Sequence, residues 1–344
     1  MTTLDPKGLP VSVNVPLSVL DLARVGPGET VAEGIDRSVR LAQTADRLGY
    51  ERVWFSEHHN MPGIASSATA LVIQHVAAHT TRIRVGAGGI MLPNHSPLVI
   101  AEQFGTLDAL YPGRIDLGLG RAPGTDQATM RALRRDGREA GRFPEDVVEL
   151  HGFLDEESPV PGVKAHPGEG AKVPIYILGS SLFGARLAAQ LGLPYAFASH
   201  FAPAMLHQAA QAYRRDFDPS APLAGPGAKP WFMAAVNVVA ADDADAADEQ
   251  RRRFEDEWLR DVLGRERTLA TAELEVVRRH PHGQQVLSML EHSVVGAQDQ
   301  VVAGLDAFAA GVQADELIVV NMAFDEDHKH RTLEMLAPHS HGAA

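Results

Sequence analysis

One short stretch of the chain combines residues that can move protons. An apolar run at residues 53–55, typical of a buried strand, leads directly into Glu57, His58 and His59. An imidazole with an ordinary pKa of about 6.5 can both give and take a proton near neutral pH, and the carboxylate of Glu57 could orient one of the two rings. We expect these three residues at the mouth of a pocket. A surface loop with two solvated histidines is the alternative, because it would give the same sequence pattern.

Four further stretches place glycine or polar residues where a predicted strand ends. They are Gly88-Gly89, Gly120-Arg121, Gly179-Ser180-Ser181 and Ser199-His200. In a barrel of parallel strands, loops that follow the strands meet at one rim. Each stretch alone could be a turn, a helix cap or a loop histidine, but together they indicate a ligand site.

The stretch Gly179-Ser180-Ser181 opens a predicted helix and therefore offers free backbone N–H groups and the positive end of a helix dipole, which suit a phosphate. Simple capping of the helix by serine is the alternative. The guanidinium of Arg121 is the preferred bidentate partner of a phosphate, so the two stretches predict a phosphorylated cofactor. Gly88 and Gly89 would let a flat ring approach the backbone, although an ordinary turn also explains them.

A second histidine pair, His75 and His79, has the i, i+4 spacing of zinc ligands on a helix. Val76 follows His75, so the H-E-x-x-H signature is missing and we interpret the pair as structural. A metal-dependent barrel hydrolase built on residues 57–59 and His200 is a rival hypothesis. Because successive side chains diverge on an extended strand end, we predict no metal site.

The elements that position these residues alternate between strands and helices. A capping box of Thr30 and Glu33 begins one helix, and Gly49 ends it. Strands are predicted near residues 13–20, 53–55, 83–86, 115–119, 173–178, 195–198, 232–240 and 316–320. No G-x-G-x-x-G follows the first strand, so this alternation predicts an α/β fold of the (β/α)8 TIM-barrel type rather than an open dinucleotide-binding sheet.

We expect residues 1–344 to form a single barrel domain with two long excursions. The first, at about residues 121–172, carries a basic patch that we interpret as a solvated helix face; it comprises Arg131, Arg134, Arg135 and Arg138. The second, at about residues 241–296, begins with a highly charged helix that is either a mobile cover or a solvated arm.

The overall composition narrows the function further. A formal net charge of −13 disfavours binding to nucleic-acid backbones, and the absence of cysteine excludes disulfides and thiolate chemistry. Residues 1–10 show no secretory signal, and no apolar stretch approaches the roughly 20 residues that span a membrane. We therefore expect a cytoplasmic protein without a membrane or nucleic-acid partner.

Several segments of the chain resemble the bacterial luciferase-like flavin monooxygenase superfamily. The matching segments are residues 48–59, 85–93, 113–121, 177–181 and 295–297. The resemblance implies a TIM-type barrel, often a homodimer, with FMN as its cofactor. It further implies that a separate flavin reductase supplies reduced FMN, which reacts with O2 to a C4a-hydroperoxide that oxygenates a small organic substrate.

The resemblance also implies roles for particular residues. His58 matches the catalytic histidine, with Glu57 and His59 as its neighbours in the motif. Gly88 and Gly89 match a pair that lies against the flavin ring, often with a cis peptide between them. The phosphate contacts are matched by Arg121, Ser180, Ser181 and Gly184, and we assign Gly179 and His200 to the same cofactor site.

Two departures limit what the resemblance implies. Gly120 stands where luciferase has a cysteine, and residues 121–126 resemble a non-luminescent subgroup, so light emission and aldehyde oxidation are not expected. Some superfamily members use a deazaflavin for hydride transfer without O2, which is the main alternative to FMN. A flavin-binding protein without catalysis is a further alternative.

Overall fold

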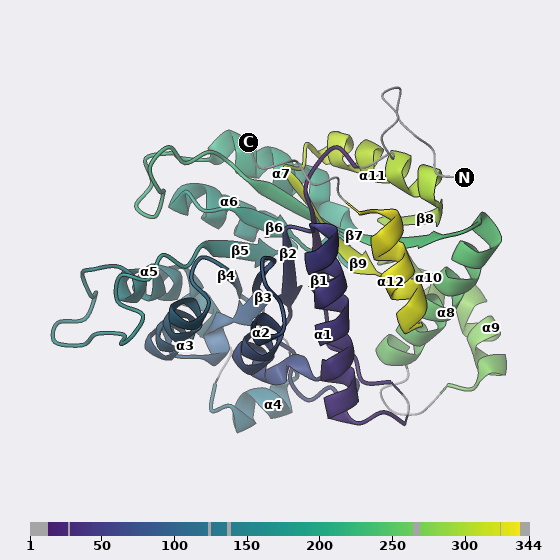
Figure 1. The fold of residues 1–344 in the computed structure, drawn as a ribbon, viewed down its shortest axis with the longest axis horizontal. Helices are drawn as coiled ribbons and strands as arrows, with labels where there is room; N and C mark the ends of the chain where they lie inside the picture. Colours follow the sequence, from purple (N-terminus) through teal and green to yellow (C-terminus); the bar gives the residue numbers. More distant parts are fainter. Residues whose placement is uncertain are drawn as a thin grey trace.

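The computed structural model describes residues 13–26, 28–122, 125–135, 139–263, 269–323 and 325–337. Within them, eight parallel strands form a closed barrel (Figure 1), because β6 pairs with β7 and β1 pairs with β9. The barrel strands are β1 (Leu17–Asp21), β2 (Arg52–Phe55), β3 (Arg84–Met91), β4 (Ile115–Gly120), β5 (Ile175–Gly179), β6 (Tyr195–Phe197), β7 (Phe232–Ala241) and β9 (Glu316–Asn321). The predicted TIM-type barrel is confirmed.

Helices cover the outside of the barrel. They are α1 (Val31–Leu48), α2 (Thr69–Ala78), α3 (Pro97–Leu110), α6 (Leu182–Leu191), α7 (Leu206–Asp216), α11 (Gln298–Val312) and α12 (Glu326–Met335). The capping box of Thr30 and Glu33 begins α1 as expected, and Gly49 ends it in the left-handed conformation with a φ of 83°. Local sequence signals therefore fix the ends of this helix.

Side chains alternate between the two faces of each strand. Val53 and Phe55 of β2 pack outward into the large core that the helices share with the sheet. Trp54 points into the barrel, where it joins a smaller cluster that includes Tyr176 and Met233. Side chains thus fill the barrel interior. The same alternation is expected for the residues that directly follow β2.

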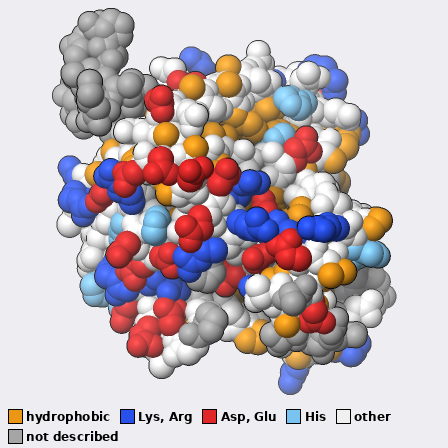
Figure 2. All heavy atoms as spheres, turned by 90° about the vertical axis from the view of Figure 1, so that its right-hand side faces the viewer, with side chains coloured by type: hydrophobic (Ala, Val, Ile, Leu, Met, Phe, Trp, Pro, Cys, Tyr) orange, Lys and Arg blue, Asp and Glu red, His pale blue; other side chains and the backbone are white. Residues whose placement is uncertain are grey.

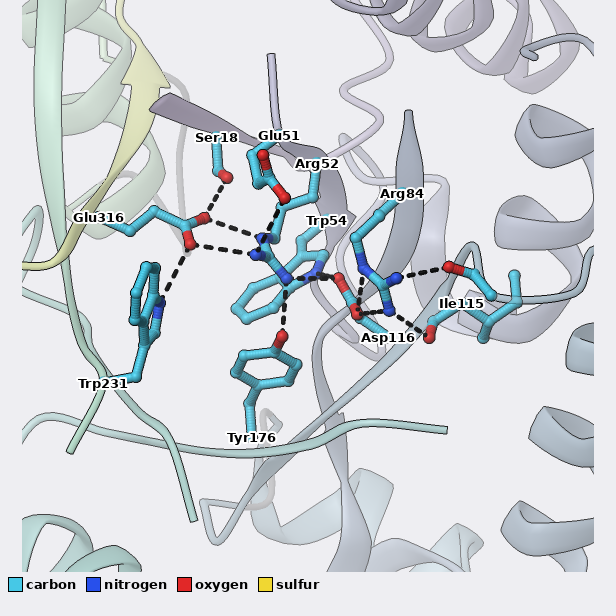
Figure 3. Close-up of polar contacts among 11 residues, drawn as sticks. Ser18, Glu51, Arg52, Trp54, Arg84, Ile115, Asp116, Tyr176, Trp231 and Glu316 are labelled. Atoms are coloured by element: carbon cyan, nitrogen blue, oxygen red, sulfur yellow. Dashed lines mark hydrogen bonds and ion pairs between the residues drawn. The ribbon is translucent and has the colours of Figure 1, made fainter. Parts of the chain in front are cut away.

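The end of the barrel at which the strands begin holds a buried ionic network (Figure 3). Arg52 donates to Glu316 at 2.8 Å and to Asp116 at 2.9 Å, and Arg84 donates to Asp116 at 2.9 Å. Burial raises the pKa of the Glu316 carboxyl, although the charge of Arg52 opposes this. Residues at this end of such barrels serve stability, because the loops that form active sites lie at the other end.

The first excursion contains α4 (Gln127–Ala132) and α5 (Phe143–Leu154), and the second contains α8 (Ala244–Leu263), α9 (Thr271–Arg279) and α10 (Pro281–Ser288). The second also contains a strand that we did not expect, β8 (Ser293–Ala297), which pairs with the end of β7. β6 pairs only with residues 232–234 at the beginning of β7. β8 pairs with residues 237–241 further along the same strand. β8 has only five residues, and its large apolar residues are the pair Val294-Val295. The sequence therefore gives little signal for this strand.

The charged helix α8 is docked on the barrel. Arg24, which follows β1, lies 3.6 Å from Glu257 and 3.3 Å from Asp261, and Arg253 lies 2.7 Å from Asp325. On the side of the molecule that Figure 2 shows, acidic and basic side chains alternate closely. α8 therefore both contacts the barrel and presents charge to solvent. No helix in the described ranges is long and apolar enough to cross a membrane.

Candidate active site

The polar residues after β2 point to two different sides. Trp54 faces the barrel interior, and if the alternation of β2 continues past Phe55, Ser56 and His58 lie on the inner side and Glu57 and His59 on the outer side. The ring nitrogen Nε2 of His59 lies 2.8 Å from Oε1 of Glu57, as this alternation requires. Glu57 thus orients His59.

Glu57 is the centre of a hydrogen-bonded cluster on the outer side. The side chain is 1% exposed and accepts bonds from Nε2 of His59, from Nε2 of His95 at 2.9 Å, from the Met91 N–H at 3.1 Å and from the Asn94 amide at 3.4 Å. Burial alone would raise the pKa of this carboxyl, but the bonds from His59 and His95 outweigh it and lower the pKa to about 2. The carboxylate is therefore ionised at any physiological pH.

His95 is a site residue that the sequence analysis did not identify. It follows the short 3₁₀ helix at Leu92–Asn94, and nothing in its immediate sequence marks it for contact with Glu57. The groups of Glu57, His59 and His95 are of the metal-ligand type, with atoms within 4.8 Å of one another. Since both imidazoles already bond to the carboxylate, the cluster is complete as a hydrogen-bond network.

The second histidine pair lies on the outer surface of α2. The rings of His75 and His79 are 4.6 Å apart, and Nδ1 of His79 lies 2.7 Å from the His75 carbonyl oxygen. Among the residues that the structure describes, no third ligand group lies close enough to form a metal site with this pair. Nδ1 of His79 is thus used in a hydrogen bond within α2.

Three polar residues on the inner side, Ser56, His58 and His200, form what we call the inner-mouth trio. β6, which precedes His200, lies opposite β2 in the strand order, and a positive charge on His58 would lower the pKa of His200. Ser56 Oγ and Nδ1 of both rings are buried and have no hydrogen-bond partner within the described part of the chain. Buried polar groups are normally bonded, so a ligand fits here.

Burial keeps both imidazoles of the trio neutral. Burial, with a smaller effect of the nearby His58, lowers the pKa of His200 to about 3. Burial also lowers the pKa of His58, although the Ser56 backbone and the Glu57 carboxylate oppose it. The backbone at each ring is fixed, because Asn237 donates to the His200 carbonyl and Ser67 to the His58 carbonyl, both at 2.7 Å. A neutral imidazole can donate one hydrogen bond and accept another.

The structure brings Arg121 to the beginning of α6, as the phosphate hypothesis requires. Its guanidinium lies 4.0 Å from the ring centroid of Phe183, in the first turn of α6, and it is solvent-exposed. Ser181 is the N-cap residue of α6, but its side chain makes no capping bond. Ser180 precedes it and is partly exposed. A cation, two hydroxyls and a helix N-terminus therefore lie together at one side of the mouth.

The glycines of the candidate site have packing reasons of their own. A Cβ on Gly184 would lie 3.2 Å from the Tyr195 ring, and a Cβ on Gly179 would lie 3.3 Å from its hydroxyl. The Gly88–Gly89 peptide is cis, as the resemblance suggested. A Cβ on Gly88 would lie 2.9 Å from Cβ of Trp54. These glycines are thus explained without any ligand.

The loop after β4 packs over the outer cluster. Thr125 donates to the His59 carbonyl at 3.3 Å, and Arg135 donates to the Asn94 carbonyl at 3.3 Å. Arg131 and Arg134 are exposed, as expected of a solvated patch, whereas Arg135 is partly buried by its contact. The fourth member of that patch, residue 138, lies outside the described residues.

The family model for luciferase-like monooxygenases matches residues 15–314 of this chain. The chain belongs to the luciferase-like monooxygenase family. A family member from Escherichia coli K12, named luciferase-like monooxygenase, is 46% identical over 324 residues, which are 93% of this chain and 96% of that protein. An N-acetyl-S-alkylcysteine monooxygenase of Bacillus subtilis is 39% identical over 67% of this chain and 70% of its own length.

Solved structures of family members agree with the barrel. The crystal structure of apo-MsnO8 superposes with a TM-score of 0.82 at 35% identity, covering 94% of this chain and 98% of that one. More distant structures share the fold alone, among them a 3,6-diketocamphane monooxygenase component in complex with FMN at 17% identity and an F420-dependent secondary alcohol dehydrogenase at 14%. The fold thus accommodates both a flavin and a deazaflavin.

Proposed function

We propose that this family member is a monooxygenase that uses reduced FMN and O2 to oxygenate a small organic substrate. The observation that supports it most directly is the arrangement of the mouth. Arg121 and the first turn of α6 offer a phosphate seat at one side, and the inner-mouth trio offers unbonded polar atoms over the barrel. A long ligand with a phosphate at one end and a polar ring at the other fits this arrangement.

The residues present suit FMN. Arg121, Ser180, Ser181 and the free N–H groups of α6 would hold the phosphate. Bound reduced FMN would supply the electrons for O2 activation, which no side chain of the chain can supply.

The protein itself would contribute orientation, water exclusion and proton transfer. His58 is partly buried and its pKa is lowered, with a buried Nδ1 that is unbonded among the described residues, so it can accept a proton there or donate one to a bound group. Glu57 and His59 would act through the fold, since their bonds hold the loops after β2 and β3 together. A positioned proton donor or acceptor of this kind accelerates a reaction by about 10²–10⁴.

The phosphate seat is tested by comparing FMN with riboflavin, which lacks the phosphate. We expect Arg121→Ala to weaken FMN binding about 10- to 100-fold, the effect of losing a charge-assisted bond, while the riboflavin dissociation constant changes less than about twofold. Arg186→Ala, an exposed arginine on the same α6, is the matched control and should leave both unchanged. Equal weakening of FMN and riboflavin would remove the phosphate assignment.

Turnover separates the monooxygenase from its alternatives. With a flavin reductase, NAD(P)H and O2, thioethers of the N-acetyl-S-alkylcysteine type are the first substrates to assay, because a B. subtilis relative is named for them. Product that appears only with O2 supports the proposal. Tight binding of a deazaflavin with O2-independent turnover would favour the hydride-transfer alternative, and FMN binding without any turnover would favour a flavin-binding protein.

We further propose that the protein works as a homodimer, with a flavin reductase as a transient partner. Large apolar side chains are exposed on the neighbouring helices α2 and α3, namely Leu71, Val99 and Leu110. Light scattering on the wild type and on Leu71→Asp would check this, since a charge in an apolar interface should shift a dimer toward monomer.

A further inference from the structure

We propose that Tyr195 is a positioning residue for the phosphate seat, and that its hydroxyl holds the turn at residues 179–181 in the shape that receives a phosphate. The side chain is completely buried and therefore does not touch a ligand itself. The inference rests on the proposed function, because it takes the cofactor to carry a phosphate. It assigns the preference for a phosphorylated flavin partly to a residue behind the site.

The first argument is the bond between Tyr195 and the turn. Tyr195 begins β6, which pairs with β5, and its hydroxyl donates to the Ser181 carbonyl oxygen at 3.1 Å. The same carbonyl accepts the first helical bond of α6 from the Ala185 N–H, but at 3.5 Å, which is long for such a bond. Burial also raises the pKa of Tyr195, so its hydroxyl keeps the proton that it donates. The tyrosine is therefore the closer partner of this carbonyl.

The second argument is the fit of the tyrosine ring beneath the turn. A Cβ on Gly179 would lie 3.3 Å from the Tyr195 hydroxyl, and a Cβ on Gly184 would lie 3.2 Å from the ring. The ring is also packed against two other buried rings, with its centroid 5.6 Å from that of Tyr213 and 5.9 Å from that of Phe232. Because the ring is held by these contacts, its hydroxyl is a fixed point for the turn.

The third argument is what a fixed carbonyl does to the donors of the helix. The peptide between Ser181 and Leu182 is trans, so its carbonyl and its N–H point in opposite directions. A carbonyl that bonds to Tyr195 therefore directs the Leu182 N–H away from the tyrosine. This N–H is among the first of α6, which have no acceptor within the helix, and the Ser181 hydroxyl makes no capping bond. Tyr195 thus orients groups that are free to bind a phosphate.

The test compares the dissociation constants of FMN and riboflavin, which differ only by the phosphate. We expect Tyr195→Phe to raise the dissociation constant of FMN about three- to tenfold, the usual effect of one lost hydrogen bond, and to leave that of riboflavin within about twofold. The variant keeps the buried ring and loses only the hydroxyl. A residue that merely supports the fold would not change the preference for FMN over riboflavin.

Tyr213→Phe is the matched control, because it removes a hydroxyl from the same group of buried rings. The Tyr213 hydroxyl donates to the Leu193 carbonyl at 2.9 Å, and Leu193 follows the opposite end of α6. It also accepts a bond from the Trp231 N–H at 3.0 Å. We therefore expect Tyr213→Phe to lower the melting temperature at least as much as Tyr195→Phe does, but to keep the wild-type preference for FMN.

A double variant tests whether Tyr195 acts through the turn. Ser181→Ala removes a hydroxyl of the phosphate seat but keeps the carbonyl to which Tyr195 donates. We expect Tyr195→Phe combined with Ser181→Ala to weaken FMN binding less than the product of the two single effects, because residues that act on one group are not additive. Effects that multiply would show that Tyr195 does not act through Ser181, and would overturn the inference.

The outcomes separate this inference from the proposed function. If the wild type prefers FMN over riboflavin and Tyr195→Phe keeps that preference, the positioning role is wrong and the phosphate seat stands. The positioning role is also wrong if Tyr195→Phe weakens both flavins equally. If the wild type binds FMN no more tightly than riboflavin, or binds neither, the phosphate seat and the positioning role are both wrong. Binding is measured below the melting temperature of each variant, so that a lost affinity does not come from a lost fold.

Discussion

Glu57 shows how one buried residue can hold the mouth together. Its carboxylate is removed from water but accepts four hydrogen bonds, two of them from imidazoles. Those bonds join the loop after β2 to the loop after β3. A buried carboxylate that lost these donors would strongly destabilise the fold. Because the carboxylate accepts the bonds in its ionised form, its contribution to stability depends on pH.

The pH dependence follows from the pKa values of Glu57 and His59. The pKa of Glu57 is lowered to about 2 from an ordinary 4.5, so the carboxylate stabilises the fold fully above about pH 4.5 and loses this effect as the pH falls toward 2. The bond to Glu57 raises the pKa of His59, so that contribution is complete below about pH 6.5 and is lost as the pH rises through the raised value.

We therefore expect Glu57→Gln to lower the free energy of unfolding by at most about 3 kcal/mol relative to the wild type, with the largest effect between about pH 4.5 and 6.5. Urea unfolding of wild type and variant at several pH values measures this difference, which should shrink toward pH 2–3. Glu334→Gln, at an exposed ion pair, is the control and should show little difference at any pH. A difference for Glu57→Gln that is constant with pH would contradict the proposed ionisation.

Among the elements, β3 and β4 approach each other too closely for ordinary side chains. A Cβ on Gly118 of β4 would lie 2.2 Å from the Ala87 carbonyl oxygen and 2.5 Å from Cδ1 of Leu178. The register of the two strands also shifts between Ala87 and Ile90, around the Gly88–Gly89 peptide. The backbone that borders the candidate ring site is thus shaped by strand packing.

Replacing this glycine should disturb the pair of strands. We expect Gly118→Ala to lower the unfolding free energy by about 1–3 kcal/mol, because the methyl group must displace backbone atoms. Gly141→Ala is the control: a Cβ there would meet no atom within 4 Å, and its change should stay within about 0.5 kcal/mol. Chemical denaturation measures both, and equal stability of the two variants would show that β3 and β4 can separate without cost.

In the whole molecule, the two ends of the barrel have different tasks. The ionic network of Arg52, Arg84, Asp116 and Glu316 closes the end at which the strands begin, while the polar groups of the candidate site lie at the opposite end. Arg52 bonds both carboxylates and Asp116 bonds both arginines, so removing the charge of Asp116 leaves Arg84 without its charged partner and Arg52 with Glu316 alone.

We expect Asp116→Asn to lower the unfolding free energy by about 3–5 kcal/mol, since Arg84 would lose its charged partner and Arg52 would lose one of its two. Riboflavin affinity, measured on the folded fraction, should stay within about twofold of the wild type, because the network lies away from the mouth. A variant as stable as the wild type would show that the network is not needed for the fold. A selective loss of riboflavin affinity would show that the two ends are coupled.

Local signals in the sequence determined much of this architecture. The capping box at Thr30 and the glycine at position 49 fixed α1, and the apolar run before Glu57 identified β2, because these effects depend only on residues a few positions apart. The alternation of strands and helices predicted the barrel and placed Arg121 near the beginning of α6. Two features could not be predicted from the sequence. β8 is too short to be recognised, and the charged residues of α8 do not indicate that this helix contacts the barrel.

Only the tertiary structure decided which side chains meet. It bonded both His59 and His95 to Glu57, and it placed His200 after β6, the strand opposite β2 in the barrel. It also assembled a charged network from β2, β4 and β9. The reason is physical: such contacts depend on the register and closure of the barrel. Both are set by strand pairings along the whole chain, so the spacing of neighbouring residues does not indicate them.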